Sequence, residues 1–228
     1  MRQAATSEQL ARSPVFGPLP TPVLDGLAAS MQRRLFKRGQ VIFHQEDPGA
    51  AVYVIESGRV KVVLENVDGE EMLLRVLGSG EIFGELALLD GQPRSATVAA
   101  LEDSVTYVLE RSVFLQFLRA EPEAALHLLG ALADLIRRLT EQVEDLALLD
   151  VPRRLERKLL ELAEAYGQPG PRGVLIDLRL SQRELASMIG TSRASVNQCL
   201  ASLEARGIIV RDGQRIVVRR IEALRPLT

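Results

Sequence analysis

The stretch that decides the fold runs from residue 83 to 98 and reads Phe-Gly-Glu-Leu-Ala-Leu-Leu-Asp-Gly-Gln-Pro-Arg-Ser-Ala-Thr-Val. In it, mostly apolar residues surround one carboxylate, Glu85, and one guanidinium, Arg94. Charged side chains are rarely placed in apolar surroundings unless they are paired or bind something. A carboxylate accepts hydrogen bonds from a sugar hydroxyl, an arginine fork suits a phosphate, and a helix beginning near Glu85 offers free N–H groups to an anion. The stretch therefore predicts a site for a phosphorylated ribose.

The alternative is a β-hairpin in which Glu85 and Arg94 form an incidental salt bridge. That alternative explains neither the glycines of the stretch nor the serine, Ser95, that directly follows Arg94. We therefore prefer the binding interpretation.

Two runs within the stretch, Gly-Glu-Leu-Ala at 84–87 and Pro-Arg-Ser-Ala at 93–96, closely resemble a known cassette. It is the phosphate-binding cassette of the cyclic-nucleotide-binding domain, as found in the cyclic-AMP receptor protein (Crp/Fnr) family of bacterial transcription regulators. The resemblance implies that Glu85 takes the ribose 2′-hydroxyl and that Arg94 and Ser95 take the cyclic phosphate. The ligand-binding residues that it implies here are Gly84, Glu85, Leu86, Ala87, Arg94 and Ser95.

Short strands surround the cassette. Residues 51–56, 59–65 and 71–77 are β-branched or aliphatic runs with near period-two alternation, and glycine-containing turns such as Asp68-Gly69 separate them. This pattern predicts an antiparallel β-roll over residues 20–119, preceded by an N-terminal arm or short helix at 1–19. With the helices that follow, the fold class is α+β.

A long helix is predicted from Pro122 to about Leu149. One apolar stripe has heptad spacing and is the predicted dimer seam; a second stripe, residues 126, 129, 136 and 143, lies beside it. We expect one stripe to pack on the roll and the other to meet the same helix of a second chain, so that residues 120–150 form a homodimer. A single wide stripe buried within a monomer is the alternative. The seam residues are Leu128, Leu132, Leu135, Leu139, Gln142, Leu146 and Leu149.

Residues 151–228 have the pattern of a helix-turn-helix followed by a hairpin. Ser181 and Glu184 have capping-box spacing, Gly190 marks a turn, and Ser192 is placed to cap a second helix that extends to Arg206. The first turns of such a helix present base-reading side chains to the major groove, and flanking arginines contact phosphates. The candidate DNA-binding residues are Arg183, Ser192, Arg193, Ala194, Ser195, Asn197, Gln198, Arg211 and Arg215. A small helical subdomain with a solvated charged face is the alternative.

Residues 180–218 resemble the winged helix-turn-helix of the same family, independently of the cassette. In enteric members the recognition positions are Arg, Glu and Arg, whereas here they are Arg193, Ala194 and Gln198. The resemblance therefore implies a two-fold palindromic DNA site, but not the enteric half-site sequence.

Charge is distributed unevenly along the 228 residues. Residues 152–228 carry 14 Lys and Arg against 8 Asp and Glu, whereas residues 1–151 carry 14 against 22. A basic C-terminal part suits contact with double-stranded DNA, although an ordinary solvated surface would also have this balance. The single cysteine, Cys199, and the absence of a signal-peptide pattern or a bilayer-spanning apolar run predict a cytoplasmic protein.

Motifs that are absent from the sequence limit the number of possible effectors. One cysteine does not hold an iron–sulfur cluster, and His44 and His127 have no haem motif around them, so we expect no metal, haem or cluster. In relatives the adenine is met by a Thr-Ser or Thr-Asn pair on the long helix, and here Leu139 and Thr140 stand there. Cyclic AMP is the first choice of effector, before cyclic GMP and cyclic di-GMP. Binding of DNA without any nucleotide is a further alternative.

Other functional classes fit less well. No clustered metal ligands or nucleophilic triad indicates an enzyme, and Glu85 with Arg94 is a binding pair rather than an acid–base pair. A regulatory subunit of a kinase or channel would share the cassette but not the helix-turn-helix. RNA polymerase is a further expected partner, because the acidic turn at residues 65–71 aligns with a loop that touches it in some relatives of the family. An ordinary solvated hairpin tip is the alternative.

Overall fold

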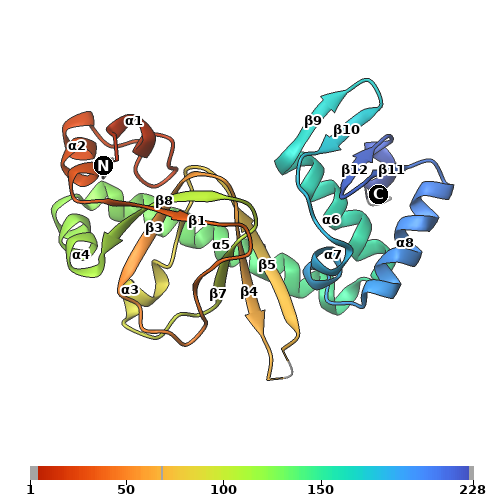
Figure 1. Cartoon of the computed structure of the whole chain (residues 1–228), viewed down its shortest axis with the longest axis horizontal. Helices are drawn as coiled ribbons and strands as arrows, with labels where there is room; N and C mark the ends of the chain where they lie inside the picture. Colours follow the sequence, from red (N-terminus) through yellow and green to blue (C-terminus); the bar gives the residue numbers. More distant parts are fainter. Residues whose placement is uncertain (1–4, 68, 226–228) are drawn as a thin grey trace. The chain divides into compact units, whose positions relative to one another are not determined.

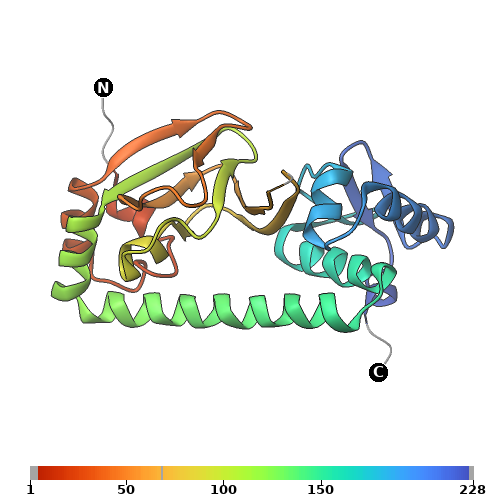
Figure 2. The same cartoon turned by 90° about the horizontal axis from the view of Figure 1, so that it is seen from below.

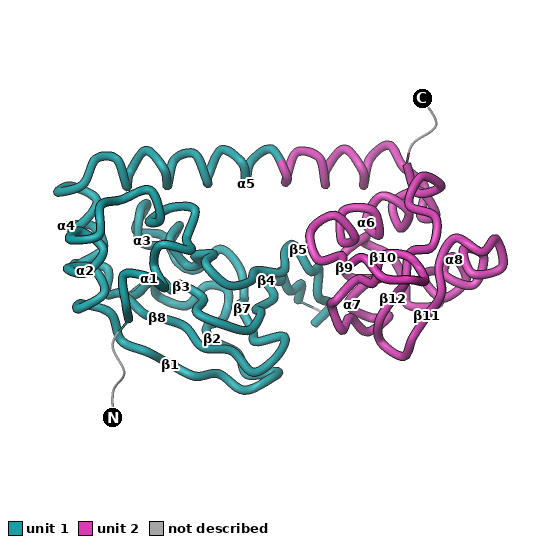
Figure 3. Tube along the Cα trace, turned by 90° about the horizontal axis from the view of Figure 1, so that it is seen from above, with its two compact units in different colours: residues 1–137 teal, residues 138–228 magenta. Residues whose placement is uncertain are grey.

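The structure is a computed structural model that describes residues 5–67 and 69–225. The chain divides into two compact units, residues 1–137 and 138–228 (Figure 3). The boundary lies within one long helix, α5 (Pro122–Leu148), which is continuous in Figure 2. Each unit has its own core and sheet structure.

The first unit contains an antiparallel β-roll of two four-stranded sheets (Figure 1). The strand order is β1-β8-β3-β6 in one sheet and β2-β7-β4-β5 in the other, and every pairing is antiparallel. This confirms the predicted roll, since three of its strands are those expected from the alternating pattern. The strands are β1 (Gln32–Phe36), β2 (Val41–Phe43), β3 (Ala51–Ser57), β4 (Val60–Glu65), β5 (Glu71–Leu77), β6 (Ile82–Phe83), β7 (Thr97–Ala100) and β8 (Ser104–Glu110).

Four helices and the first part of α5 accompany the roll: α1 (Ser7–Leu10), α2 (Thr21–Ala29), α3 (Leu86–Asp90) and α4 (Arg111–Ala120). The N-terminal segment contains the short helix α1, the second of the two forms expected there, and it is packed rather than extended. Leu10 and Phe16 are fully buried in the same core as Leu109 and Phe114. Residues 5–19 therefore belong to the unit's core, because their apolar side chains are removed from water there. Asp68, in one predicted turn, lies outside the described residues.

A second core cluster fills the interior of the roll beside the cassette. Tyr53 and Phe83 stack with their ring centroids 4.9 Å apart, and the Phe43 ring lies 5.7 Å from Tyr53 and 6.0 Å from Phe83. Phe83 directly precedes Gly84, so this aromatic cluster anchors the start of the cassette.

The second unit combines helices with a four-stranded antiparallel sheet of order β11-β12-β10-β9. Asp150 caps α6 by accepting a hydrogen bond from the Arg153 N–H, and Pro152 stands in the helix's first turn. The predicted helix-turn-helix and hairpin are both present. The elements are α6 (Val151–Tyr166), β9 (Gly167–Gly170), β10 (Gly173–Ile176), α7 (Gln182–Met188), α8 (Arg193–Ala205), β11 (Ile209–Asp212), β12 (Arg215–Val218) and the 3₁₀ helix η1 (Ile221–Leu224).

Strand β9 is one of the elements that the sequence did not predict. Its residues, Gly-Gln-Pro-Gly, have no apolar alternation, yet they pair with β10 in a hairpin. The strand lies at the edge of the sheet, where a proline is tolerated because one side of the strand needs no partner. In the part of the chain that the structure describes, none of the helices combines the length and the apolar character that crossing a bilayer requires.

Candidate functional site

The cassette lies between β6 and β7, with Glu85 at the start of α3 and Arg94 in the loop after it. Both charges are buried: Glu85 is 9 % exposed and Arg94 is 4 % exposed. Glu85 is the residue that precedes α3, as the sequence predicted from the Gly84-Glu85 step. The Arg94 backbone is fixed as well, since its N–H donates to the Asp47 carbonyl and its own carbonyl accepts from the Glu46 N–H, each at 2.9 Å.

The Arg94 guanidinium is held on three sides. Nη1 donates to the Gly84 carbonyl at 2.6 Å, and Nη2 donates to the Ala51 carbonyl at 2.7 Å. Its central carbon lies 4.1 Å from the centroid of the Phe43 ring, in cation–π geometry. The fork is therefore already oriented before any ligand is bound.

One donor of this guanidinium is left without a partner. Arg94 Nε is buried and makes no hydrogen bond, which is costly for a charged group. Within residues 5–67 and 69–225 no ion pair joins Arg94 to Glu85, so the incidental salt bridge considered above is not found. A buried cation with an unused donor and no carboxylate partner suits an anionic ligand.

Burial also affects the protonation of the Glu85 carboxyl. Removal from water raises the pKa of this carboxyl above its ordinary value. Opposing that shift are a hydrogen bond from its own backbone N–H and the charges of Arg75 and Arg94. The burial effect is the larger, so ionised Glu85 is less favourable here than in water. Hydrogen-bond donors from a ligand, such as sugar hydroxyls, would stabilise the carboxylate.

Small residues make room at the site. Gly84 has φ +83°, and a Cβ built on it would lie 2.6 Å from Arg94 Nη1. A Cβ on Gly49 would lie 2.4 Å from the Cβ of Ala87, so the 49–51 segment lies directly against α3. Of the remaining cassette residues, Ala87 is buried, Leu86 is half-buried and Ser95 is exposed. The structure therefore brings together all six cassette residues that the sequence predicted.

Three contributors to the site were missed in the sequence. The Phe43 ring and the Ala51 carbonyl come from strands that precede Arg94 by about fifty residues, and only the sheet topology brings them near. Arg75 of β5 pairs with Glu81 at 2.9 Å and contributes positive charge near Glu85. The only sequence signal for this role of Arg75 was its position as a basic residue within an otherwise apolar strand.

In the first half of α5, the stripe predicted to form the dimer seam packs on the core, and the second stripe is exposed instead. Leu128, placed in the dimer seam, is 3 % exposed and buried in the first unit's core, and Leu132 packs against that core. The second stripe is the exposed one, because residues 126, 129, 136 and 143 are between 60 % and 66 % exposed. This corrects the seam: its early leucines are used within the chain, where the roll covers them. Leu135, Leu139, Gln142 and Leu149 are half-buried, and Leu146 is exposed.

The two residues expected to meet a base, Leu139 and Thr140, lie on the part of α5 that belongs to the second unit. Leu139 is half-buried and Thr140 is exposed. Thr140 follows Ile136 by four residues and precedes Val143 by three, so it shares the face of the exposed stripe.

The helix-turn-helix is built as its sequence predicts. Ser181 and Glu184 form the reciprocal capping box of α7, and Ser192 caps α8 by accepting from the Ser195 N–H at 3.1 Å. Val196, Leu200 and Leu203 are buried on the inner face of α8. The outer face of its first turns is left to solvent.

The predicted DNA-binding residues fall into two groups. In and beside α7 and α8, Arg183, Ser192, Arg193, Ala194 and Gln198 are exposed, and Ser195 and Asn197 are half-buried. Ser195 and Gln198 also line a cavity between α6 and α8. Arg193 is partly oriented, since its Nε donates to the Gln182 side chain at 3.3 Å. The two arginines of the β11–β12 hairpin, Arg211 and Arg215, are instead paired within the protein, with Glu204 and Asp177.

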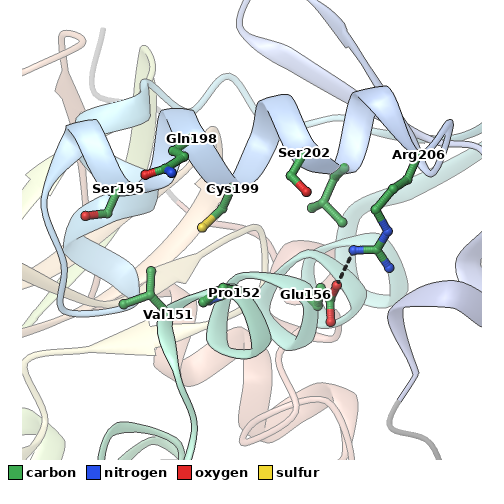
Figure 4. Close-up of a pocket in the computed structure, with 9 residues that line it drawn as sticks. Val151, Pro152, Glu156, Ser195, Gln198, Cys199, Ser202 and Arg206 are labelled. Carbon is green, nitrogen blue, oxygen red and sulfur yellow. Dashed lines mark hydrogen bonds and ion pairs between the residues drawn. The ribbon is translucent and has the colours of Figure 1, made fainter.

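A cavity of about 380 Å³ lies between α6 and α8, with Cys199 and Glu156 in its wall (Figure 4). Burial raises the pKa of the Cys199 thiol, with a further rise from the charges of Asp150 and Glu156, which keeps the thiol protonated. Across the described residues, no cluster of three or more His, Cys, Asp or Glu has the arrangement of a metal site. His44 is exposed and His127 is half-buried.

Comparison with known proteins gives two domain matches. The cyclic nucleotide-binding domain family matches residues 33–121, and the Crp-like helix-turn-helix domain family matches residues 153–227. They fall in the order expected from the two motifs.

Whole-chain similarities agree with these matches. The CRP-like cAMP-activated global transcriptional regulator of Mycobacterium tuberculosis is 32 % identical over 217 residues, which is 95 % of this chain and 97 % of that protein. The cyclic AMP receptor protein of Thermus thermophilus is 38 % identical over 197 residues, 86 % of this chain and 88 % of that protein. A solved structure of the c-di-GMP responsive global regulator CLP of Xanthomonas campestris has a TM-score of 0.77 at 25 % identity. That match covers 87 % of this chain and 99 % of CLP.

Proposed function

The chain belongs to the Crp family of cyclic-nucleotide-responsive, DNA-binding transcription regulators, and from this premise we propose that cyclic AMP is its effector and that binding of cyclic AMP raises its affinity for DNA. The ligand occupies the cassette of residues 84–95. Arg94 and Ser95 bind the cyclic phosphate, and the Glu85 carboxylate accepts a hydrogen bond from the ribose 2′-hydroxyl. Gly84, Leu86 and Ala87 line the site.

The observation that carries the proposal is the buried, preorganised Arg94. Its fork is fixed by two carbonyls and the Phe43 ring, and its Nε has no partner. A cyclic phosphate supplies both the negative charge and the acceptor that this buried group lacks. Ligand binding then removes a cost that is already present in the folded protein.

Cyclic AMP is favoured among the nucleotides because the names of the Mycobacterium and Thermus relatives include it. Thr140 meets the adenine through its hydroxyl, and Leu139 packs beside the base. Cyclic di-GMP is the second candidate, favoured by the fold similarity to the Xanthomonas regulator.

We propose a homodimer formed through the exposed stripe of α5: Leu126, Leu129, Ile136 and Val143. These large apolar side chains face solvent in the single chain, and their spacing of three and seven residues is that of a helix–helix seam. Thr140 lies on the same face, so the partner helix and the base would meet at one surface. Residues 120–150 thus form the dimerisation helix, between the nucleotide-binding roll at 20–119 and the DNA-binding domain at 151–228.

The dimer has a direct test in solution. Ile136→Glu places a charge in the middle of the stripe, where burial against a second helix would be costly, and we expect a monomer by light scattering. The matched control is Arg137→Glu, one residue away, also exposed but outside the stripe; it should remain a dimer. If Ile136→Glu has the wild-type mass, the stripe is not the interface.

DNA is bound by the N-terminal part of α8 and its cap, residues 192–198, which presents base-reading side chains to the major groove, while Arg183 contacts a phosphate. Two such helices related by the dimer axis read a palindromic site. We also propose that RNA polymerase is a partner, through the acidic turn of residues 65–71 (Asp68 lies outside the described residues). The protein acts in the cytoplasm, which suits its single free cysteine.

The effector is tested by calorimetric titration of the purified protein with cyclic AMP, cyclic GMP and cyclic di-GMP. We expect heat of binding with cyclic AMP at the lowest concentration of the three. No heat with any of them up to the millimolar range would end the nucleotide hypothesis. A gel shift with and without cyclic AMP tests the response, since equal DNA binding in both lanes would show that the cassette does not control it.

A further inference from the structure

The last turn of α8 is joined to the hairpin by one charge pair. Glu204 of α8 accepts from the backbone N–H of Arg211 at 2.9 Å and from its Nε at 2.7 Å, and Nη2 of the same fork lies 2.5 Å from the carboxylate. Both carboxylate oxygens are used. Nε and Nη2 both reach Oε2, and Oε1 accepts from the backbone N–H, so one carboxylate fixes both the side chain and the backbone of Arg211.

The Glu204 side of the pair is ionised under ordinary conditions. The side-chain hydrogen bond from Arg211, followed by the backbone hydrogen bond from the same residue, lowers the pKa of Glu204 below its usual value. The pair therefore persists at neutral and mildly acidic pH, and weakens only when the pH falls through that lowered pKa.

A second charge pair holds the end of the same helix on another side. Arg206 donates through Nη1 to Glu156 of α6 at 3.2 Å (Figure 4). Arg153 donates to the other oxygen of that buried carboxylate at 3.2 Å. The cavity beside this pair shows that α6 and α8 are not closely packed along this face. Charge pairs therefore act together with the packing of Leu203, the buried residue next to Glu204, in holding the end of α8.

A rigid helix transmits the position of its end to its beginning. Glu204 is eleven residues beyond Arg193, about 16 Å along the axis, so it lies outside the part of α8 that reads bases. A change in its last turn nevertheless changes the angle at which the first turn enters the major groove, and small misplacements at a binding surface are costly.

We propose that Arg211 is a positioning residue, which binds Glu204 and so fixes the hairpin against α8, rather than a residue that contacts a DNA phosphate. The proposal rests on the reading of DNA by α8. It changes the role first expected for Arg211 from the sequence, where the arginine was a phosphate contact.

The two roles predict opposite effects for the same substitution. If Arg211 positions α8, Glu204→Gln breaks the pair and weakens DNA binding. If Arg211 contacts a phosphate, Glu204→Gln removes a competitor for its guanidinium and leaves DNA binding unchanged or tighter. Glu164→Gln, at an exposed position on α6, is the matched control for the loss of one negative charge.

The test measures affinity for a DNA site selected from a random pool, across a range of salt concentrations. We expect Glu204→Gln and Arg211→Gln each to weaken binding by about threefold to tenfold, with the salt slope of the wild type. The double variant should be no worse than either single one, because both remove the same contact. Exchange of the two charges, with Glu204→Arg and Arg211→Glu together, restores the side-chain pair but not the hydrogen bond from the residue 211 N–H, so it should recover part of the affinity.

Tighter or unchanged binding by Glu204→Gln, with a salt slope lowered by about one in Arg211→Gln, would overturn the proposal and make Arg211 a phosphate contact. A measurement without DNA distinguishes a failure of this proposal from a failure of the proposal that α8 binds DNA. Hydrogen exchange at the Arg211 N–H should accelerate in Glu204→Gln relative to wild type, in the full chain. Unchanged exchange there would show that the pair does not hold the hairpin.

Discussion

The cassette and the end of α8 both place arginines beside carboxylates, but they do so in different ways. In the cassette, Arg94 and Glu85 are buried, are not paired with each other and are held by backbone groups. At the end of α8, Arg211 and Glu204 are partly exposed and joined directly. The buried charges leave Arg94 Nε without a partner, which under our proposal the nucleotide supplies. The partly exposed charges of Arg211 and Glu204 pair with each other.

The difference has an energetic meaning. A buried charge without a counter-charge destabilises the folded protein, and a ligand that supplies the missing partner recovers that free energy as affinity. An exposed pair contributes little stability, and its value lies in the geometry that it fixes. The first region is thus suited to sensing a ligand and the second to holding a recognition helix.

Arg94→Leu should have the largest effect, because it removes the phosphate partner entirely. We expect nucleotide affinity to fall by a hundredfold or more, at about 3 kcal/mol or above for a buried charged hydrogen-bond set, measured by calorimetry. Arg94→Lys, which keeps the charge but loses the fork, should recover only part of it. Arg34→Leu, exposed on β1, is the control and should bind as the wild type does. Retained nucleotide-stimulated DNA binding in folded Arg94→Leu would place the effector elsewhere.

Arg193→Ala should have the next largest effect, and on sequence choice rather than on general affinity. Loss of a bidentate base contact removes about 1–3 kcal/mol of discrimination at one position of the site, measured by selection from a random DNA pool. Arg183→Ala is the contrasting variant, since loss of a phosphate contact weakens all sequences alike and lowers the salt slope by about one. Unchanged sequence preference in Arg193→Ala would show that this arginine does not read a base.

Glu85→Gln should have the smallest effect, a gain in stability without ligand. Burial raises the folded-state pKa of Glu85 above its ordinary 4.5, so the folded protein binds more protons than the unfolded chain above that pH. Stability is then lost as the pH rises through the raised pKa, and a neutral amide avoids this loss. Thermal unfolding should show Glu85→Gln more stable than wild type at pH 7.5, with the difference shrinking towards pH 5.

The control for that comparison is Glu110→Gln, at an exposed position before α4, which should unfold like the wild type at each pH. A Glu85→Gln variant that is less stable than wild type at pH 7.5 would mean that Arg75 and Arg94 stabilise the carboxylate more than burial disfavours it. The cassette would then resemble the paired charges of α8.

Local chemistry in the sequence predicted much of this structure. The alternation of residues 51–77 predicted three strands of the roll, and Ser181, Glu184 and Ser192 predicted where α7 and α8 begin. Each of these signals lies within a few residues of the feature that it determines.

What the sequence did not predict depends on contacts between distant segments. Phe43 and the Ala51 carbonyl reach Arg94 only through the strand order of the roll. The two stripes of α5 are both apolar in sequence, and only packing against the core shows which one is buried. The pairing of Arg211 with Glu204 likewise requires the hairpin to fold back on α8. Spacing along the chain carries little information about such contacts.

Under our proposal, the nucleotide at the cassette controls DNA binding by α8. This control is tested most directly by measuring DNA affinity with and without saturating cyclic AMP, and cyclic AMP affinity with and without the selected DNA. We expect both affinities to rise, and by the same factor, because coupling between two binding sites is reciprocal. A DNA affinity that is unchanged by cyclic AMP, with cyclic AMP bound, would contradict it.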